Sequence, residues 1–188
     1  MKWNIPILLT WLRVWLIPVF TVLFYLPDSW LSEESVNWWA AIIFTVAAVT
    51  DWLDGYLARK WNQTSSFGAF LDPVADKLMV AVALILLVSL DRTYAFFAMI
   101  IIGREITISA LREWMAQLGR RNNVAVAQIG KFKTAAQMAA IVMLLVGSED
   151  FFGMNLIFFG NILMAAAVIL TVWSMCYYLK VAFADYKE

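Results

Sequence analysis

Six long apolar stretches constrain this chain more than any other feature of its sequence. Each approaches the ~20 apolar residues that an α-helix needs to cross a bilayer. The stretches lie at residues 7–27, 38–59, 73–90, 93–116, 131–147 and 154–180. We therefore predict an all-α polytopic membrane protein with six transmembrane helices. Because Pro6 precedes the first stretch and Arg13 and Pro18 interrupt it, we expect its opening turns to form a short N-terminal interfacial helix.

Composition agrees with a membrane protein and excludes several functions. Hydrophobic residues make up 63% of the chain and charged residues 15%, whereas soluble domains have about 45–50% and about 25%. The 188 residues leave room for one domain, residues 1–188. A formal charge of zero removes any general attraction to nucleic acid, and the absence of histidine removes the commonest general base. The single cysteine, Cys176, allows no intrachain disulfide.

The basic residues predict how the chain is oriented. They gather at alternate ends of the predicted helices, as at Arg59 and Lys60, and the opposite ends carry Arg92 alone. Because cytoplasmic ends are enriched in lysine and arginine, both termini and the segment 51–76 are expected to face the cytoplasm. The N-terminal stretch lacks an A-x-A-like cleavage site, so we expect it to be retained and not removed as a secretory signal.

Four aspartates interrupt this apolar pattern at the end of the second stretch and the start of the third. Asp51 and Asp54 are three residues apart and Asp72 and Asp76 four apart, so each pair shares a helix face. The turn between the pairs lets them face each other. Hard carboxylate oxygens around one point suit Mg²⁺ or Mn²⁺, as one ion or two. The alternative is that these are exposed carboxylates near a helix end, as a single aspartate there usually is.

The spacing of these residues resembles the signature of the CDP-alcohol phosphatidyltransferase family. The eight matching positions are Asp51, Asp54, Gly55, Ala58, Arg59, Gly68, Asp72 and Asp76. The resemblance extends over most of the chain. NIPILLTWLR at the start, REITISALREW in the fourth stretch and GKFKTAAQ in the fifth look like the bacterial members that use glycerol 3-phosphate.

The resemblance implies a homodimer of six-helix bundles in the bacterial inner membrane, with a polar cavity open to the cytoplasm. The family transfers a phosphatidyl group from CDP-diacylglycerol to an alcohol and releases CMP. By this resemblance, Asp51, Asp54, Asp72 and Asp76 hold two divalent metal ions, and Asp76 also takes the proton of the attacking hydroxyl. The positions that it assigns to CDP-diacylglycerol are Thr10, Gly55, Ala58, Arg59, Ser65 and Gly68.

The cationic residues favour an acceptor that carries its own phosphate, above all glycerol 3-phosphate. Arg104 lies near the middle of the fourth stretch, where burying a charge in the bilayer costs the most free energy. Arg112 lies ~12 Å further along and within about 80° of the same face. Lys131 and Lys133 differ by about 200° around the fifth helix, so only one of them is expected to face the cavity. Arg112, Lys131 and Lys133 could instead simply reflect the excess of basic residues on the cytoplasmic side of membrane proteins. Arg104 could instead form a structural ion pair, for example with Glu105.

Other functions also use aspartates within membrane helices. Serine or an inositol phosphate could be the acceptor of the same reaction. Membrane prenyltransferases use aspartate-rich motifs, but generally two motifs in separate halves of a longer chain. A divalent-cation transporter would need acidic groups partway across the membrane. None lies deep in the first, third, fifth or sixth stretch. A metal-dependent phosphatidyltransferase therefore remains the favoured prediction.

Overall fold

The computed structural model describes residues 5–60, 66–117 and 127–184 of the chain. Within these ranges it has six α-helices and no β-strand, apart from an isolated bridge between Phe151 and Met154. The helices are α1 (Ile5–Leu23), α2 (Glu33–Lys60), α3 (Ser66–Ser89), α4 (Ala95–Gln117), α5 (Ala127–Val146) and α6 (Leu156–Ala184). The predicted all-α class and the order of the six helices are confirmed.

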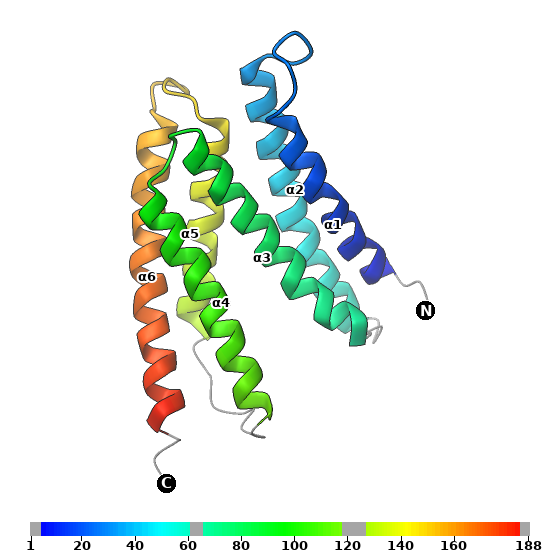
Figure 1. Ribbon diagram of the computed structural model, residues 1–188, viewed down its shortest axis with the longest axis vertical. Coiled ribbons are helices and arrows are strands. Elements are labelled where there is room, and N and C mark those ends of the chain that lie inside the picture. The colour runs from blue at the N-terminus through cyan, green and yellow to red at the C-terminus, as the bar shows by residue number, and fades with distance from the viewer. Residues whose placement is uncertain (1–4, 61–65, 118–126, 185–188) are drawn as a thin grey trace.

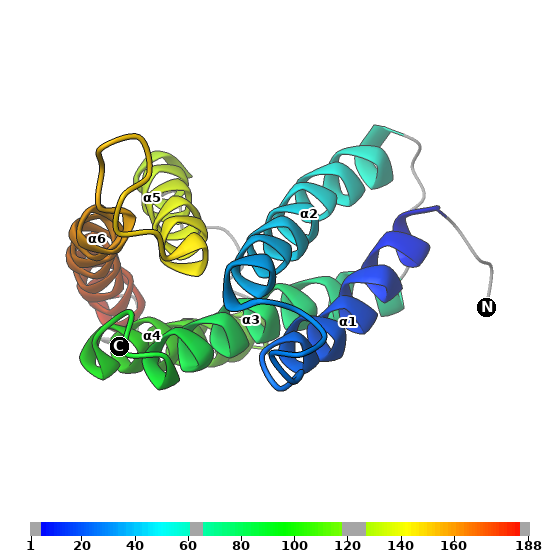
Figure 2. The same cartoon turned by 90° about the horizontal axis from the view of Figure 1, so that it is seen from above.

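The six helices form an elongated bundle, and α1 begins and α6 ends in its lower half as drawn in Figure 1. α1 packs on α2 and α3, α4 packs on α3 and α6, and α5 packs mainly on α6 and also on α2. Seen from above, α1 and α2 lie on one side, α5 and α6 lie on the other, and α3 and α4 connect them (Figure 2). This arrangement brings the end of α2, the start of α3 and the start of α1 together.

Local chemistry explains where several helices begin. Ser32 precedes α2 and accepts a hydrogen bond from the Ser35 amide at 3.3 Å, while Glu33 and Glu34 place negative charge in its first turn. Asn155 precedes α6, and its side chain accepts from the Phe158 amide at 2.8 Å. These side chains satisfy amide groups that the helix itself leaves without a partner.

Two predicted boundaries were wrong. α3 begins at Ser66 and not at residue 73, so Gly68 lies in the helix and not in the turn expected between the two aspartate pairs. The helix also continues through Pro73. α1 runs without a break from Ile5 to Leu23, so the predicted short interfacial helix is not separate from the first long helix in the described residues. Proline is tolerated in the first turn of a helix, where Pro6 lies.

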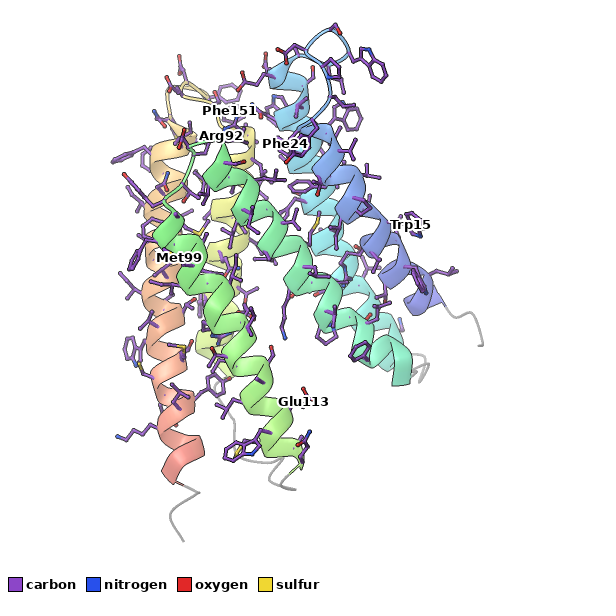
Figure 3. All side chains as sticks on the ribbon, viewed as in Figure 1. Trp15, Phe24, Arg92, Met99, Glu113 and Phe151 are labelled. Atoms are coloured by element: carbon purple, nitrogen blue, oxygen red, sulfur yellow. The ribbon has the colours of Figure 1, made fainter. Side chains whose placement is uncertain are left out.

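The apolar core occupies the half of the bundle away from the termini. Its fully buried members come from all six helices: Phe20, Phe44, Leu84, Leu87, Ile101, Ile141, Leu144, Leu145 and Met164. Large apolar side chains also cover the outside, among them Trp15, which is 68% exposed and projects from α1 (Figure 3). An outer surface of this kind suits contact with lipid.

One helix of the described residues is long and apolar enough to cross a membrane. It is the segment Leu156–Lys180 of α6, with 25 residues and a mean hydropathy of 2.3. Leu8–Leu23 in α1 and Phe132–Val146 in α5 are apolar but shorter. The structure thus confirms six helices, while their crossing of the bilayer as six spans stays a prediction.

Candidate functional site

Six of the nine buried polar side chains in the described residues lie in the half of the bundle where α1 begins and α6 ends. They come from the first half of α1, the first half of α5 and the second half of α6. The residues are Thr10, Arg13, Lys133, Gln137, Thr171 and Ser174. Burying polar groups is costly unless they are paired or serve a ligand, so this half of the bundle is the place to look for a site.

The predicted carboxylates lie at the junction of α2 and α3. Asp51 is in α2, and Asp72 and Asp76 are one turn apart in α3. The charge of Asp51 interacts with those of both Asp72 and Asp76. The side chain of Asp54 lies outside the described residues. The structure therefore brings three of the four predicted metal ligands into one electrostatic cluster.

Two side chains from α1 contact this cluster. Thr10, which is 1% exposed, donates its hydroxyl to Oδ1 of Asp72. Arg13, which is also 1% exposed, contacts Oδ1 of Asp51 through Nη1 at 2.9 Å. Sequence reasoning had assigned Thr10 to the nucleotide and missed Arg13 as a site residue. A charge inside an apolar stretch is a signal that could have found it, since such charges usually pair.

The cluster is chemically suited to a divalent ion, although the described side chains do not by themselves complete a metal site. In the described part of the chain, no three acidic, histidine or cysteine side chains stand close enough to hold one. The three described aspartates offer hard oxygen ligands, which Mg²⁺ and Mn²⁺ prefer. The donor set therefore fits such an ion, with Asp54 as the further ligand that the sequence predicts.

A cavity of about 220 Å³ lies next to Asp76, between α3, α4, α5 and α6. Three cations line it, one each from α3, α4 and α5: Lys77, Arg104 and Lys133. Two acids, Asp76 and Glu105, line it as well. The charge of Asp76 interacts with Asp51 of α2 and with Glu105 of α4. Asp76 therefore belongs both to the carboxylate cluster and to this cation-lined cavity.

Arg104 is held in the cavity wall by two neighbours. Its Nη1 contacts Oε1 of Glu105 at 2.7 Å, and its Nη2 donates to the Ser174 hydroxyl at 3.4 Å. The ion pair with Glu105 that the sequence left open is thus present. The side chain is 10% exposed, and its buried Nε has no hydrogen-bond partner among the described residues. The side chain lines the cavity, so the guanidinium can still face a ligand there.

Lys133 of α5 lines the cavity. Its side chain is 4% exposed and its Nζ contacts Oε1 of Glu105 at 3.0 Å. The side chains of Lys131 and Arg112, the other two predicted phosphate ligands, lie outside the described residues. The same is true of Gly55, Ala58 and Arg59. Ser65 also lies outside them, while Gly68 is buried within α3.

Sequence reasoning missed six polar residues of the cavity, namely Lys77, Glu105, Thr134, Gln137, Ser174 and Tyr178. Lys77 donates to the Ser109 hydroxyl of α4, and Ser174 and Tyr178 reach the cavity from α6. Lys77 directly follows the predicted site residue Asp76, and this adjacency could have identified it as a site residue. Nothing in the apolar sequence of α6 marks Ser174 or Tyr178, because their role depends on which helix packs against α4.

An apolar groove of about 510 Å³ lies between α2 and α5. Its α2 side includes Phe44 and Val49, and its α5 side includes Met138 and Val142. Met138 lines both this groove and the polar cavity. The two spaces therefore meet at one side chain.

Comparisons with known proteins identify the family of this chain. Residues 3–173 match the family described as CDP-alcohol phosphatidyltransferase. The chain is 54% identical over 184 residues to the CDP-diacylglycerol–glycerol-3-phosphate 3-phosphatidyltransferase of Haemophilus influenzae, covering 97% of this chain and 95% of the relative. It is 51% identical over 190 residues to the protein of the same name in Escherichia coli K12, covering 98% of each. The chain belongs to the CDP-alcohol phosphatidyltransferase family.

Proposed function

We propose that this protein is a phosphatidylglycerophosphate synthase, which transfers the phosphatidyl group of CDP-diacylglycerol to sn-glycerol 3-phosphate and releases CMP. The observation that carries the proposal is the sharing of Asp76 between an acidic cluster and a cation-lined cavity. A reaction between a pyrophosphate-bearing lipid and a phosphate-bearing alcohol needs both. The names of the relatives above support the same activity.

The acceptor would occupy the cavity of about 220 Å³. Arg104 and Lys133 are buried cations on its wall and would bind the phosphate, with Arg112 and Lys131 as further predicted ligands. Arginine suits this role because its fork matches two phosphate oxygens at once. The acceptor hydroxyl would then lie toward Asp76.

The donor would lie across the carboxylate cluster and the apolar groove. Thr10, Gly55, Ala58, Arg59, Ser65 and Gly68 are the predicted contacts for its CDP part. The groove between α2 and α5 is apolar and lies open at the surface of the bundle, where an acyl chain could bind. Because Met138 lines both spaces, the lipid and the alcohol can approach each other there.

Asp76 would act as the general base of one displacement. Its carboxylate takes the proton of the acceptor hydroxyl, whose oxygen forms a bond to the β-phosphorus while the bond from that phosphorus to CMP breaks. A chain with no histidine has to use another base, and an aspartate in this cavity can serve. Asp51, Asp54, Asp72 and Asp76 would hold two Mg²⁺ or Mn²⁺ ions. Such ions, when bound, neutralise charge on the pyrophosphate and on the leaving CMP.

We also infer that one domain over residues 1–188 crosses the bacterial inner membrane six times and functions as a homodimer. The start of α1 and the end of α6 lie in the same half of the bundle, which supports an even number of crossings (Figure 1). The basic residues at alternate helix ends support a cytoplasmic location of both termini and of the site.

The activity can be tested with purified protein, CDP-diacylglycerol and a panel of acceptors, with CMP release as the signal. We expect release with glycerol 3-phosphate and little with serine or an inositol phosphate. A chelator should stop the reaction and added Mg²⁺ or Mn²⁺ should restore it. Asp72→Asn is the control that should remain inactive with every acceptor. Faster release with serine would contradict the proposed acceptor, and activity unaffected by the chelator would contradict the metal.

A further inference from the structure

Glu105 holds two of the three cations of the cavity through a single oxygen. Its Oε1 lies 2.7 Å from Nη1 of Arg104 and 3.0 Å from Nζ of Lys133. The two cations come from different helices, α4 and α5. Their side chains are 10% and 4% exposed, whereas Glu105 is 27% exposed. The carboxylate is therefore the most accessible member of this group.

Arg104 and Lys133 lie close enough to contact the same oxygen atom, and an anion beside them offsets the repulsion between their charges. Glu105 supplies that anion from within the chain. A phosphate oxygen of an acceptor would occupy the same kind of position, since it too would contact both cations. The carboxylate and the phosphate therefore compete for the same two side chains.

We propose that Glu105 is an internal counter-ion, which holds Arg104 and Lys133 in place while the cavity is empty and competes with the phosphate of the acceptor and of the product. Glu105 is thus a positioning residue, and this inference rests on the proposed function. The product keeps the phosphate of glycerol 3-phosphate, so the two cations have to release it at every turnover. A carboxylate that takes the cations back favours this release.

Removing the negative charge of Glu105 should affect phosphate binding and turnover in opposite directions. Glu105→Gln keeps a side-chain oxygen that can accept from Arg104 or Lys133, but it removes the negative charge that opposes a phosphate. Phosphate should then bind more tightly, and kcat should fall because the product leaves more slowly.

The test uses inorganic phosphate as a competitive inhibitor against glycerol 3-phosphate. We expect its inhibition constant to fall roughly tenfold in Glu105→Gln, with a lower kcat and a lower KM for glycerol 3-phosphate. Glu113→Gln is the matched control, because Glu113 lies on the same helix, is exposed and does not line the cavity (Figure 3). It should leave all three constants unchanged.

Glu105→Asp provides a second variant, which retains the charge on a shorter side chain. Its inhibition constant should lie between those of the wild type and Glu105→Gln, and it remains a test if Glu105→Gln does not fold. An inhibition constant that is unchanged or higher in a folded Glu105 variant overturns the inference. If Glu105 only held the structure together, its loss would displace Arg104 and Lys133 and weaken phosphate binding. If wild-type protein releases no CMP with glycerol 3-phosphate and phosphate does not bind, the proposed function itself fails.

Discussion

Arg92 and Arg104 are both largely shielded from solvent and lie close together in the sequence, but their surroundings are very different. Arg92, just before α4, is 8% exposed and donates to the carbonyl oxygens of Leu144 and Leu145, at 3.4 and 2.9 Å, and to Glu33 at 3.3 Å. It lies at the end of the bundle away from the termini (Figure 3). Arg104, within α4, faces a cavity and has a buried Nε with no hydrogen-bond partner among the described residues.

The difference shows that burial alone does not identify a functional charge. The carbonyls that Arg92 contacts belong to the last turn of α5, where a helix leaves them without partners and where positive charge is favourable. Arg92 therefore closes the end of α5 and needs no ligand. Arg104 has one acid beside it and lines a cavity, so its surroundings leave room for an anion.

The largest effect should come from Asp76, at the cavity end of the molecule. Asp76→Asn removes the proposed base, so kcat should fall by roughly 10²–10⁴ while the thermal unfolding midpoint changes little. CDP-diacylglycerol should still bind through the remaining ligands, which calorimetric titration can measure. Complete loss of donor binding would instead make Asp76 chiefly a metal ligand.

Arg104→Ala should change acceptor binding and little else. Loss of a charge-assisted hydrogen bond worth ~1.5–3 kcal/mol should raise the KM for glycerol 3-phosphate roughly ten- to hundredfold, with the donor KM almost unchanged. Arg104→Lys should recover part of this loss, because lysine keeps the charge without the fork. If Arg104 served only structure, as Arg92 does, both KM values would shift together in a protein that folds poorly. A well-folded variant with an unchanged acceptor KM would remove Arg104 from the site.

Gly147→Ala should displace the side chain of Arg92 from its hydrogen bonds while keeping the residue itself. Gly147 has a φ of +63°, and a Cβ there would come within 2.6 Å of Nη1 of Arg92. We expect the free energy of unfolding to fall by about 2 kcal/mol, with acceptor and donor KM unchanged. Gly153 is the matched control, since its φ is +79° and a Cβ would meet nothing within 4 Å. Equal losses in the two variants would show that contact with Arg92 adds nothing to the backbone strain.

The smallest effect should come from the exposed partner of Arg92. Glu33 is 82% exposed, and such surface pairs contribute only about 0.2–1 kcal/mol. Glu33→Gln should therefore lower the unfolding midpoint slightly and leave activity intact. Glu34→Gln removes the same charge from the same first turn of α2, so the difference between the two variants isolates the contact with Arg92. A loss of several kcal/mol in Glu33→Gln alone would mean that the carboxylate, and not the α5 carbonyls, holds Arg92.

Hydropathy predicted all six helices, because each has a long apolar face whatever its neighbours are. It misplaced the start of α3, because the first residues of that helix, from Ser66 to Asp72, include polar and small residues and do not resemble an apolar span. Pro6 and Pro18 suggested a break in the first helix, but the packing of α1 on α2 and α3 accompanies one continuous helix.

The candidate site was predicted where it depends on spacing within a helix and missed where it depends on packing between helices. Fixed spacing identified Asp51, Asp72 and Asp76 as a group. It could not show that Arg13 contacts Asp51, because that contact depends on how α1 lies against α2. Likewise, helical geometry limited the lysines of α5 to one facing the cavity, while only the packed structure places Lys133 beside Glu105.

Met138 has a consequence for how fast the two substrates can meet. Met138 is the side chain common to the polar cavity and the apolar groove, so in the proposed reaction a solute from water would meet a molecule dissolved in the bilayer near it. The first arrives by diffusion in three dimensions and the second by diffusion in a plane. The rate should therefore follow the bulk concentration of the alcohol but the surface density of the lipid. Diluting the membrane with inert lipid at constant total donor should slow the reaction.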